Sequence, residues 1–516
     1  MTGRLSSILQ GIEISQLQGH ADGQVSSICY DSRRCEENCL FVAIPGLKTD
    51  GHHYIAEALD RGARFIMHEH DFTPPAGITA IQVGDCRRIL GALGKNFFGH
   101  PSAEICLIAV TGTNGKTTIT YILESIIKAA GFTPGVLGTV NYRYGGTIMP
   151  APNTTPESFD MHRILRQMAA AGVSHVIAEV SSHAIDLRRI DDCDFDLGIF
   201  TNLSQDHLDY HGNMESYYSA KKRFFAEVLP RSQKDRSIRM IVNRDDPWGR
   251  RLLSEVPLPA WGFGVETPGD IHVENFALTP QETEAMVCRH GECSFRVSSS
   301  LIGRHNLYNI LAAAAGALAL GIAEKDIIAG ISALRNVPGR LERVNLPGEP
   351  DVFVDYAHTE DALEKVLQNL SSFHANRIIT VFGCGGDRDR GKRPLMGRAA
   401  ATLSDLAILT SDNPRSENPL DILKEIEVGI PKEGIRKYTA EEVGNKLPEQ
   451  GYAVIPDRRT AIETAIGSAE KGDIVLIAGK GHEDYQLIGA QRLFFDDRLV
   501  AGEVLTRIRN EKGNQP

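Results

Sequence analysis

Short apolar runs followed by polar, glycine-rich loops recur along this chain. In one of them, "ICLIAV" (residues 105–110) leads into a glycine-rich loop, and "KTTITYILESIIKAAG" (residues 116–131) then spaces its apolar residues at helical intervals. Gly131 stands where a helix C-cap is expected. Apolar runs that alternate with helices predict a mostly parallel sheet. Further runs of this kind are "HVIAEV" (175–180), "LGIFTNL" (197–203) and "RMIVN" (239–243).

The same pattern starts again after "RNVPGRLERV" (residues 335–344). Three apolar runs follow there, and each ends in a polar loop. In parallel α/β sheets, ligands bind beyond the carboxyl ends of the strands, so these loops are candidate binding elements. The three segments are "RIITVFGCGGDRD" (377–389), "LAILTSDNPR" (406–415) and "DIVLIAGKGHED" (473–484).

These patterns predict an α/β protein with three domains. The first hundred residues mix short strands and helices and end at the polar segment "FFGHPSAE" (97–104). We expect an N-terminal α/β domain at residues 1–102, a central parallel-sheet domain with the glycine-rich loop at 103–338, and a C-terminal Rossmann-like domain at 339–516. A chain of 516 residues is too long for one hydrophobic core, which agrees with this division.

Composition and charge narrow the possible classes of function. Hydrophobic residues form 42% and charged residues 23% of the chain, as in soluble globular proteins. The net charge of -11, without any run rich in lysine or arginine, argues against nucleic-acid binding. The N-terminus lacks a basic start followed by an apolar run, and no apolar stretch reaches membrane-spanning length. We therefore expect a cytoplasmic protein without membrane insertion.

The nine cysteines form no C-x-x-C pair. Cys35 and Cys39, or Cys288 and Cys293, are close enough in sequence for metal pairs, but no histidine or cysteine partners follow at zinc spacing. Free thiols in a reducing compartment are the expectation.

The glycine-rich loop "TGTNGKTT" (residues 111–118) is the strongest candidate for chemistry. A Walker A sequence has an outer glycine where Val110 stands here, and the nearest glycine is Gly112. The flanking strand and helix still present backbone N–H groups to a phosphate, with Lys116 as a positive charge and the Thr117 hydroxyl as a ligand for Mg²⁺. The alternative is a strand-to-helix turn with an incidental lysine, which these flanks disfavour.

With its shortened glycine spacing, "TGTNGKTT" resembles the Mur ligase superfamily, and the resemblance extends over nearly the whole chain. Members of this family are ATP-dependent enzymes that join amino acids to cytoplasmic peptidoglycan precursors. The resemblance implies that a substrate carboxylate attacks the γ-phosphate of ATP, and that an amine then displaces phosphate from the acyl phosphate. The residues implied to bind ATP are Gly112, Thr113, Asn114, Gly115, Lys116, Thr117, Thr118, Asn306, Arg340, Asp355 and His358.

Several of these ATP contacts are less specific than the loop itself. Asn306 and Asn309 both occur in "IGRHNLYN", and Arg340, Asp355 and His358 belong to the region where the strand pattern restarts. For each of these five residues, a role as a helix cap, a salt-bridge partner or a buried polar group is equally open.

The resemblance also implies a metal centre. Glu179 ends the run "HVIAEV", His207 follows the next run, and Lys221 lies on a predicted helix. In this family the matching lysine is carbamylated by CO₂, which requires a pKa low enough to leave a neutral amine. Taken alone, a glutamate at a strand end is more often a cap or a salt-bridge partner, an isolated histidine is usually structural, and a pair of lysines usually lies on a solvated helix face. Lys222 is the alternative to Lys221. The implied ligands of two Mg²⁺ ions are Thr117, Glu179, His207 and the carbamate of Lys221, and the implied catalytic residues are Lys116, Glu179, His207 and Lys221.

Two regions resemble the parts of Mur ligases that bind the UDP-linked substrate, UDP-N-acetylmuramoyl-L-Ala-D-Glu. "PNTTPES" (residues 152–158) reads by itself as a helix N-terminus, with a threonine cap and Pro156 at the first helical position. Leu187 stands where the family often has glutamine, so one family contact to the substrate differs here. The implied contacts are Tyr30, Ser32, Leu47, Lys48 and Thr49 in the N-terminal domain, and Asn153, Thr154, Thr155, Ser181 and Arg189 in the central domain.

The loop "SDNPRSENP" (residues 411–419) is the candidate for choosing the amino acid. Pro414 fixes the turn, and the Arg415 guanidinium can bind a carboxylate through two hydrogen bonds. Two arginines, Arg388 and Arg415, and one glutamate, Glu483, suit an amino acid with two carboxylates and a spare ammonium, which describes meso-diaminopimelate. Lysine lacks the distal carboxylate and would leave Arg415 unpaired. The resemblance agrees, because D-N-P-R occurs in diaminopimelate-adding members; the alternative is that Arg415 caps its own loop. The implied binding residues are Arg388, Asp412, Asn413, Pro414, Arg415, Gly479 and Glu483.

The resemblance therefore implies a ligase that uses ATP, Mg²⁺ and a carbamylated lysine to add meso-diaminopimelate to UDP-N-acetylmuramoyl-L-Ala-D-Glu, and we expect it to be a monomer. A folylpolyglutamate-type ligase shares the core of the superfamily, but the N-terminal domain and D-N-P-R disfavour it. A nucleotide-dependent switch or scaffold protein is the non-enzymatic alternative, and it has no use for the arginine pair.

Overall fold

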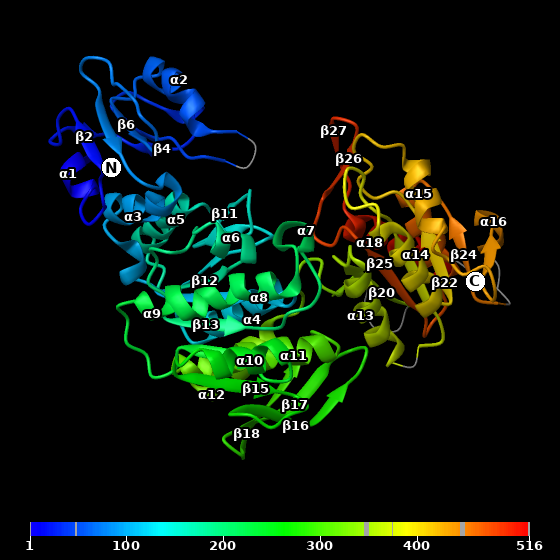
Figure 1. Ribbon diagram of the computed structural model, residues 1–516. Helices are drawn as coiled ribbons and strands as arrows, with labels where there is room; N and C mark the ends of the chain where they lie inside the picture. Colours follow the sequence, from blue (N-terminus) through cyan, green and yellow to red (C-terminus); the bar gives the residue numbers. More distant parts are fainter. Residues whose placement is uncertain (1, 47–48, 345–349, 374, 444–448, 514–516) are drawn as a thin grey trace. The chain divides into compact units, whose positions relative to one another are not determined.

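The computed structural model describes residues 2–46, 49–344, 350–373, 375–443 and 449–513. Parallel strands alternate with helices over most of these residues, which confirms the predicted α/β class (Figure 1). No helix within the described residues is long and apolar enough to cross a membrane. The chain forms two compact units, and the division into three domains at residues 102 and 338 stays a prediction. The first unit comprises Met1–His272, Cys288–Glu292 and Asn309–Gly330, and the second comprises Val273–Val287, Cys293–Tyr308 and Ile331–Pro516.

A five-stranded sheet lies in the N-terminal part of the first unit, with the strand order β2-β7-β6-β5-β4. Strands β4 to β7 run parallel, and β2 pairs antiparallel with β7. The inner strands are apolar at successive positions because both faces are covered: Leu40 and Val42 of β5 join one core cluster and Phe41 joins another. The elements of this region are β1 (Gly3–Arg4), α1 (Leu5–Ile8), β2 (Gln16–Gln18), β3 (Gln24–Val25), β4 (Ile28–Cys29), η1 (Ser32–Arg34), β5 (Leu40–Val42), η2 (Gly51–Tyr54), α2 (Ile55–Asp60), β6 (Phe65–His68), β7 (Thr79–Gln82), α3 (Cys86–Phe97) and η3 (Pro101–Ala103).

The larger sheet carries the glycine-rich loop, and the order of its strands as far as β16 is β11-β10-β9-β12-β8-β13-β14-β15-β16. The strands from β9 to β16 in this order are parallel, and β10 and β11 form an antiparallel edge. Because the side-chain period of a strand is two, Leu107 and Ala109 of β8 pack into the core on the face that α5 covers. The strands are β8 (Cys106–Thr111), β9 (Pro134–Leu137), β10 (Tyr142–Tyr144), β11 (Thr147–Met149), β12 (His175–Glu179), β13 (Leu197–Phe200), β14 (Met240–Asn243), β15 (Ala260–Gly264) and β16 (Ile271–Leu278).

The ends of the first helices in this region test two sequence predictions. Helix α4 begins at Lys116 and ends at Ala129, and Gly131 just beyond it has φ +80°, which confirms the predicted C-cap glycine. Helix α5 begins at Ser158, with Glu157 as its N-cap, so the predicted helix start at Pro156 is wrong. The helices of this region are α4 (Lys116–Ala129), α5 (Ser158–Ala170), α6 (Ser182–Asp186), α7 (Leu208–His211), α8 (Met214–Arg223), the π-helical turn η4 (Phe224–Val228), α9 (Leu229–Arg231), α10 (Pro247–Glu255), α11 (Arg304–Ala319) and α12 (Glu324–Ala333).

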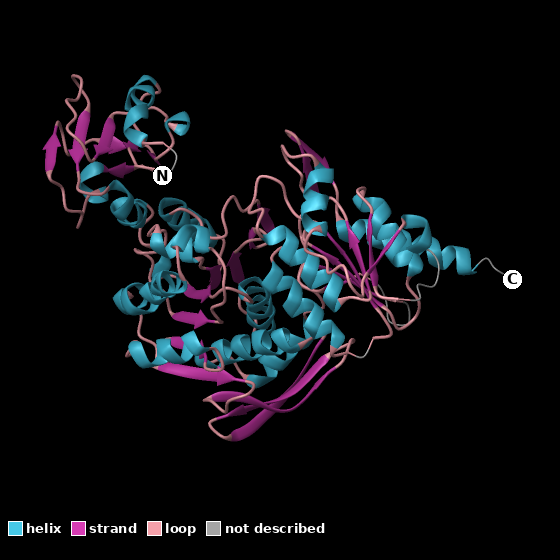
Figure 2. Ribbon diagram, turned by 45° about the vertical axis from the view of Figure 1, so that its right-hand side comes forward, coloured by secondary structure: helices cyan, strands magenta, loops and turns pink. Residues whose placement is uncertain are grey.

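The second unit is built on a seven-stranded sheet with the order β19-β20-β25-β21-β22-β24-β23. All its strands are parallel except β19. Val352 and Val354 of β20 pack with α17 and α18, and Phe353 packs with α13 to α15, so helices cover both faces (Figure 2). The strands of this sheet are β19 (Glu342–Arg343), β20 (Asp351–Asp355), β21 (Ile378–Phe382), β22 (Leu406–Leu409), β23 (Arg436–Tyr438), β24 (Gly451–Val454) and β25 (Ile474–Ala478), and the helices are α13 (Glu360–Ser371), α14 (Lys392–Leu403), α15 (Pro419–Glu427), α16 (Ala440–Val443), α17 (Arg458–Ser468) and α18 (Asp497–Gly513). Four further strands lie outside this sheet: β17 (Thr283–Arg289), β18 (Glu292–Ser299), β26 (Tyr485–Ile488) and β27 (Gln491–Phe494).

Strand order explains why distant motifs meet in each unit. In the second unit β25, β21 and β22 are neighbours, so the three polar loops that follow them leave the same edge of the sheet. In the first unit β9, β12, β8 and β13 are neighbours, which brings Glu179 beside the glycine-rich loop.

The cysteines depart from expectation at two positions. Seven of them are free thiols, as predicted. Cys288 of β17 and Cys293 of β18 are disulfide-bonded, so the expectation of nine free thiols is wrong there.

Candidate active site

The glycine-rich loop joins β8 to α4 in a conformation that requires glycine at two positions. Gly112 and Gly115 have φ angles of +148° and +89°. A Cβ atom would overlap Thr201 Oγ1 at Gly112 and Asn309 Oδ1 at Gly115. The loop therefore wraps closely around the N-terminus of α4, where the helix favours an anion.

Lys116 folds back over this loop as the first residue of α4. Its Nζ donates 2.8 Å hydrogen bonds to the carbonyl oxygens of Gly112 and of the next residue. Thr201 Oγ1 donates to the Asn114 carbonyl at 2.6 Å, and the Asn114 N–H donates to Asn202 Oδ1 at 2.9 Å. The segment after β13 thus stabilises the conformation of the loop, and the ammonium group of Lys116 lies against the loop carbonyls. Thr201 and Asn202 were missed by sequence reasoning.

Glu179 is a buried carboxylate beside the loop, with 1% of its surface exposed. Its Oε2 accepts hydrogen bonds from Thr117 Oγ1 at 3.0 Å and Thr139 Oγ1 at 2.9 Å, and its Oε1 accepts one from the Thr139 N–H at 3.0 Å. The structure therefore brings together Thr117 and Glu179, as the resemblance implies. Thr139, which follows β9, was not predicted.

Lys221 projects from α8 into the same region, and 1% of its surface is exposed. Its Nζ donates a 3.0 Å hydrogen bond to the Gly112 carbonyl. Burial lowers the pKa of this amine well below its ordinary value, and the positive charge of Lys116 lowers it further. Lys222 instead forms a 2.8 Å ion pair with Glu255 on the protein surface, so of the two alternatives only Lys221 meets the loop.

His207 is the N-cap of α7; its side chain is 45% exposed, and its backbone has φ +55°. Burial lowers the pKa of its imidazole; Asp206 opposes this shift, and the charges of Lys116 and Lys221 add to it. The ring lies 4.9 Å from that of His183, centroid to centroid. Burial and the neighbouring histidines lower the pKa of His183 to about 4. Both rings are therefore neutral at neutral pH and able to act as nitrogen ligands or hydrogen-bond partners.

The segment Asn153–Thr155 is connected to Glu179 and α6. Thr155 Oγ1 donates to the Glu179 carbonyl at 2.8 Å and accepts the Ser181 N–H at 3.1 Å. Arg189 donates to the Thr155 carbonyl at 3.2 Å and pairs with Glu157 at 2.8 Å. The predicted substrate residues of the central region therefore form one network beside the phosphate loop.

Thr154 extends this network, because its Oγ1 lies 3.1 Å from Thr139 Oγ1. Tyr142 donates a hydrogen bond to the Asn153 carbonyl. Leu187 is the C-cap of α6 and stands two residues before Arg189.

The predicted substrate contacts of the N-terminal region have different partners in the structure. Tyr30 lines a cavity of about 190 Å³ and donates a hydrogen bond to Asp160. Burial and the Asp160 carboxylate raise the pKa of Tyr30. Ser32 donates to Glu57 at 2.8 Å, and Thr49 Oγ1 lies 3.1 Å from Tyr54 Oη. Leu47 and Lys48 lie outside the described residues. The lining residues of the cavity are Ser27, Ile28, Cys29, Tyr30, Asp31, Arg34, Glu36, Phe159, Asp160 and Arg163.

In the second unit, Arg415 lies where the loops after β21 and β22 approach each other. Its backbone has φ +51°, and its Nη1 donates a 2.6 Å hydrogen bond to the Gly386 carbonyl. A Cβ atom at Gly386 would overlap the Pro414 carbonyl, so glycine permits this approach. Arg388 is exposed in the same loop, and it makes no ion pair with the residues that the structure describes. Two guanidinium groups thus stand at one edge of the sheet.

Glu483 and Asn413 lie on the neighbouring loops. Asn413 Nδ2 donates to Glu483 Oε2 at 2.9 Å. Burial raises the pKa of the Glu483 carboxyl, and the charge of Asp412 raises it further, whereas Lys480 lowers it. Gly479, with φ +113°, carries the chain from β25 into this loop.

Lys480 is a residue that sequence reasoning missed, although it stands between the predicted Gly479 and Glu483. It is fully buried, and its Nζ donates to the Tyr485 carbonyl at 2.7 Å and to Asn413 Oδ1 at 3.0 Å. The same Nζ lies 3.2 Å from Asp412 Oδ1. Lys480 therefore holds the D-N-P-R turn against the loop after β25. A lysine two residues after a buried strand was the available signal.

The remaining predicted ATP contacts have local partners in the second unit. Asn306 Nδ2 donates to the Ile302 carbonyl at 2.8 Å, whereas Asn309 is the asparagine that lies against Gly115. Asp355 accepts the Leu341 N–H at 2.6 Å and the Ala357 N–H at 2.8 Å. Arg340 lies with its guanidinium carbon 4.9 Å from the Tyr356 ring centroid, and His358 Nδ1 lies 2.9 Å from the Tyr356 carbonyl. Their proposed role toward ATP stays a prediction.

Known proteins resemble this chain over its whole length. The Mur ligase middle domain matches residues 110–317, the Mur ligase glutamate ligase domain matches 339–481, and the Mur ligase family catalytic domain matches 24–100. A relative from Geobacter sulfurreducens, named UDP-N-acetylmuramoyl-L-alanyl-D-glutamate–2,6-diaminopimelate ligase, is 44% identical over 500 residues, which cover 96% of this chain and 98% of the relative. This chain belongs to the Mur ligase family.

Two further comparisons agree with this Mur ligase assignment. A relative of the same name from Alkaliphilus metalliredigens is 41% identical, with 97% of each chain covered. A solved structure titled as that of a UDP-N-acetylmuramoyl-L-alanyl-D-glutamate–2,6-diaminopimelate ligase has a TM-score of 0.70 at 30% identity, covering 99% of this chain and all of the other.

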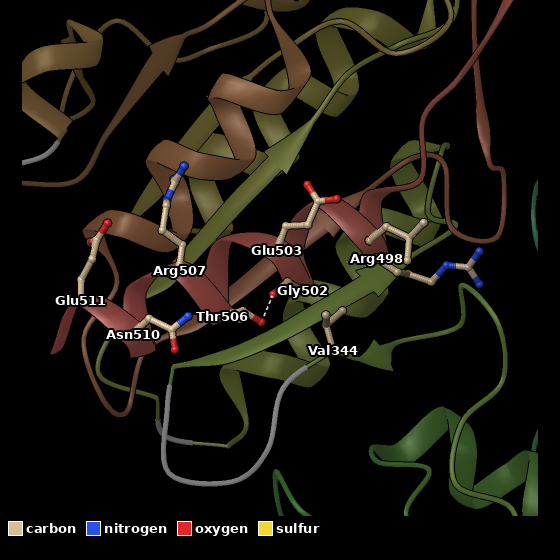
Figure 3. Close-up of a pocket in the computed structure, with 9 residues that line it drawn as sticks. Val344, Arg498, Gly502, Glu503, Thr506, Arg507, Asn510 and Glu511 are labelled. Carbon is tan, nitrogen blue, oxygen red and sulfur yellow. Dashed lines mark hydrogen bonds between the residues drawn. The ribbon is translucent and has the colours of Figure 1, made fainter. Parts of the chain in front are cut away.

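This Mur ligase has a second, larger cavity that is not lined by the predicted site residues. It has a volume of about 830 Å³ and runs along α18, where Arg498 and Arg507 alternate with Glu503 and Glu511 (Figure 3). None of the predicted site residues lines it. The mixed charges give the hollow no preference for an anion or a cation.

Proposed function

We propose that this Mur ligase adds meso-diaminopimelate to the D-glutamate of UDP-N-acetylmuramoyl-L-Ala-D-Glu, with ATP as the co-substrate, as a monomer in the cytoplasm. The observation that carries the proposal is the pair of arginines, Arg388 and Arg415, which both approach Gly385, with the half-buried Glu483 carboxylate in electrostatic contact with Arg415. The names of its relatives support the same assignment. An amino acid with carboxylates at both ends and a free ammonium satisfies all three groups.

The first half of the reaction belongs to the phosphate loop. The substrate carboxylate oxygen attacks the γ-phosphorus of ATP, the bond from this phosphorus to the ADP oxygen breaks, and an acyl phosphate forms. Lys116 exchanges its loop carbonyl acceptors for phosphate oxygens and offsets their negative charge. The Asn153–Thr155 and Arg189 network orients the carboxylate-bearing substrate beside the loop.

The second half of the reaction forms the amide. The amine nitrogen of diaminopimelate attacks the acyl carbon, phosphate leaves with the electrons of its carbon–oxygen bond, and the nitrogen loses a proton. Arg415 and Arg388 bind carboxylates of the amino acid, and Glu483 accepts hydrogen bonds from an ammonium group. Lys480 keeps Asn413 and Asp412 in place for this contact.

The residues around Glu179 fit a divalent cation. The hydrogen-bond partners of this buried carboxylate in the described structure are hydroxyl and amide groups without charge, and buried carboxylates are otherwise paired with a cation or a metal. We propose that Thr117, Glu179, His207 and Lys221 hold Mg²⁺, which would screen the negative charges of the two reactants.

Lys221 fits carbamylation. Its amine is buried, its pKa is lowered, and its acceptor is the neutral Gly112 carbonyl, so the environment favours the neutral amine that reaction with CO₂ requires. The carbamate would supply oxygen ligands where the lysine supplies none. Lys222, which is paired with Glu255 at the surface, is the matched control.

Phosphate release and product mass test the proposed reaction directly. Purified protein with ATP, Mg²⁺, bicarbonate and the UDP-dipeptide should release phosphate in step with tripeptide formation when meso-diaminopimelate is added. Lysine should support little of either. A folylpolyglutamate-type ligase would instead require a folate substrate, and a nucleotide switch would release phosphate without any dependence on the amino acid.

Two lysine variants test the proposed centre. Lys221→Ala should lose tripeptide formation, whereas Lys222→Ala should keep it, because Lys222 pairs only at the surface. Mass spectrometry of the intact protein in bicarbonate should detect a CO₂ adduct that Lys221→Ala lacks. Equal activity of the two variants would contradict the assignment of Lys221.

A further inference from the structure

Three cysteines of the N-terminal region converge on one point of the structure. Cys29 lies at the end of β4, Cys35 follows η1, and Cys39 precedes β5. Cys29 Sγ lies 2.9 Å from Cys35 Sγ and 3.5 Å from Cys39 Sγ, and all three sulfur atoms lie within 4.8 Å of one another. Cys35 and Cys39 have no further ligand at zinc spacing in the sequence, but in the structure Cys29 at the end of β4 lies beside them.

We propose that Cys29, Cys35 and Cys39 form a thiolate site for a soft, thiophilic metal ion, Zn²⁺ or Cu⁺. Three sulfur ligands without a hard oxygen donor are the chemistry that these ions prefer over Mg²⁺. The site lies in a different part of the first unit from the proposed Mg²⁺ residues, and it does not depend on the ligase reaction.

The geometry is close to that of a metal site. Metal–sulfur bonds of about 2.3 Å place ligand sulfurs ~3.8 Å apart in a tetrahedral site, so the observed spacing needs to open by only about 1 Å. Within the described residues, no fourth histidine, cysteine or carboxylate atom joins the group, so the protein supplies three ligands.

The surroundings explain why an ion would be held. The three side chains are buried, and Cys39 is completely so, among the apolar residues of one core cluster. Burying thiolate charge in such a place is unfavourable unless a cation compensates for it. A soft metal ion bound by the three sulfur atoms would supply that compensation.

The position of the cluster links it to the cavity beside Tyr30. Cys29 and Cys35 stand at the two ends of the segment 30–34, which contributes Tyr30, Asp31 and Arg34 to the lining of that cavity. A shared metal ion would join both ends of this segment to Cys39. Metal binding would therefore fix the shape of the cavity wall in the same way that a short cross-link does.

Cobalt substitution tests the site on the full-length protein. Protein prepared under reducing, metal-free conditions should bind about one Co²⁺ with a near-ultraviolet sulfur-to-metal charge-transfer band, and Zn²⁺ or Cu⁺ should displace it. Residues around Glu179 contain no sulfur ligand and cannot produce this band. Competition with chromophoric chelators then gives the affinities for Zn²⁺ and for Cu⁺ separately.

Single alanine variants identify the ligands. Cys29→Ala, Cys35→Ala and Cys39→Ala should each weaken Zn²⁺ binding by at least about 100-fold and remove the cobalt band. Cys86→Ala is the matched control, because Cys86 is a buried free thiol of the same region outside the cluster. Retention of the band in Cys39→Ala, or loss of it in Cys86→Ala, would overturn the proposal.

A measurement on the unmutated protein tests the site even if the alanine variants fail to fold. Zn²⁺ should protect Cys29, Cys35 and Cys39 from alkylation and leave the labelling of Cys106 unchanged, as read by peptide mass spectrometry. Equal labelling with and without Zn²⁺ and Cu⁺ would refute the site. A disulfide between any two of the three, found in freshly prepared reduced protein, would refute it as well.

Discussion

Replacement of Lys480 by methionine tests whether a buried charge fixes the amino-acid pocket. Methionine keeps the length and most of the volume of the side chain but removes the ammonium. The Tyr485 carbonyl, Asn413 Oδ1 and Asp412 Oδ1 then lose the donor that lies 2.7, 3.0 and 3.2 Å away. The carboxylate of Asp412 would remain buried beside an apolar group.

The expected loss of stability follows from burial. Lys480 has no exposed surface and Asp412 has 9%, so water cannot replace the lost contacts. Removing one partner of a buried ion pair costs about 3–5 kcal/mol, because the remaining charge is left uncompensated. This is a large part of the free energy of unfolding of an ordinary domain, about 5–15 kcal/mol.

Denaturant unfolding and steady-state kinetics measure the two consequences. Lys480→Met should lower the free energy of unfolding of the second unit by about 3 kcal/mol or more. It should also raise KM for diaminopimelate about 10-fold or more, because Asn413 and the D-N-P-R turn lose their anchor, while KM for ATP changes little.

Lys471→Met is the matched control for this experiment, because Lys471 is exposed just before β25. It should leave both stability and kinetics unchanged. If Lys480→Met unfolds within about 0.5 kcal/mol of the unaltered protein and keeps its KM for diaminopimelate, Lys480 does not position the pocket.

Three further variants test other parts of the structure. Arg415→Ala should raise KM for diaminopimelate about 10- to 100-fold through loss of a charged hydrogen bond, with ATP binding unchanged in calorimetry; an unaltered KM would exclude Arg415 from the pocket. Thr139→Val should lower kcat about 5- to 10-fold because Glu179 loses a hydroxyl donor, and Thr139→Ser should restore it; equal rates for both would contradict this role. Burial lowers the pKa of His162 from 6.5 to about 3. As the pH falls from 6.5 toward 3, the unfolded chain binds a proton at this histidine that the folded protein does not, so the free energy of unfolding decreases over this range and is unaffected above pH 6.5. Between pH 8 and pH 4.5 the loss is about 2–3 kcal/mol, and His162→Leu should remove that part of the pH dependence in urea melts; a curve of the same steepness would show that other groups cause it.

Elements with a strong local signal were predictable from the sequence. The apolar run 105–110, the glycine-rich loop and the periodic helix after it have the predicted order, and Gly131 lies just beyond the end of that helix. The prediction failed at Pro156, where Thr155 bonds to the Glu179 carbonyl instead of capping a helix. Local preference yields where a long-range contact satisfies the same groups better.

The sequence by itself determined the α/β class, the phosphate loop and the polar loops that follow the strands, because periodicity, glycine positions and charge are properties of short segments. Only the tertiary structure decided which side chains share a site. It placed Lys221 rather than Lys222 at the loop, Asn309 rather than Asn306 against Gly115, and Cys29 beside Cys35 and Cys39. Strand order causes this, because the order in which parallel strands pair brings together loops that are far apart in the chain.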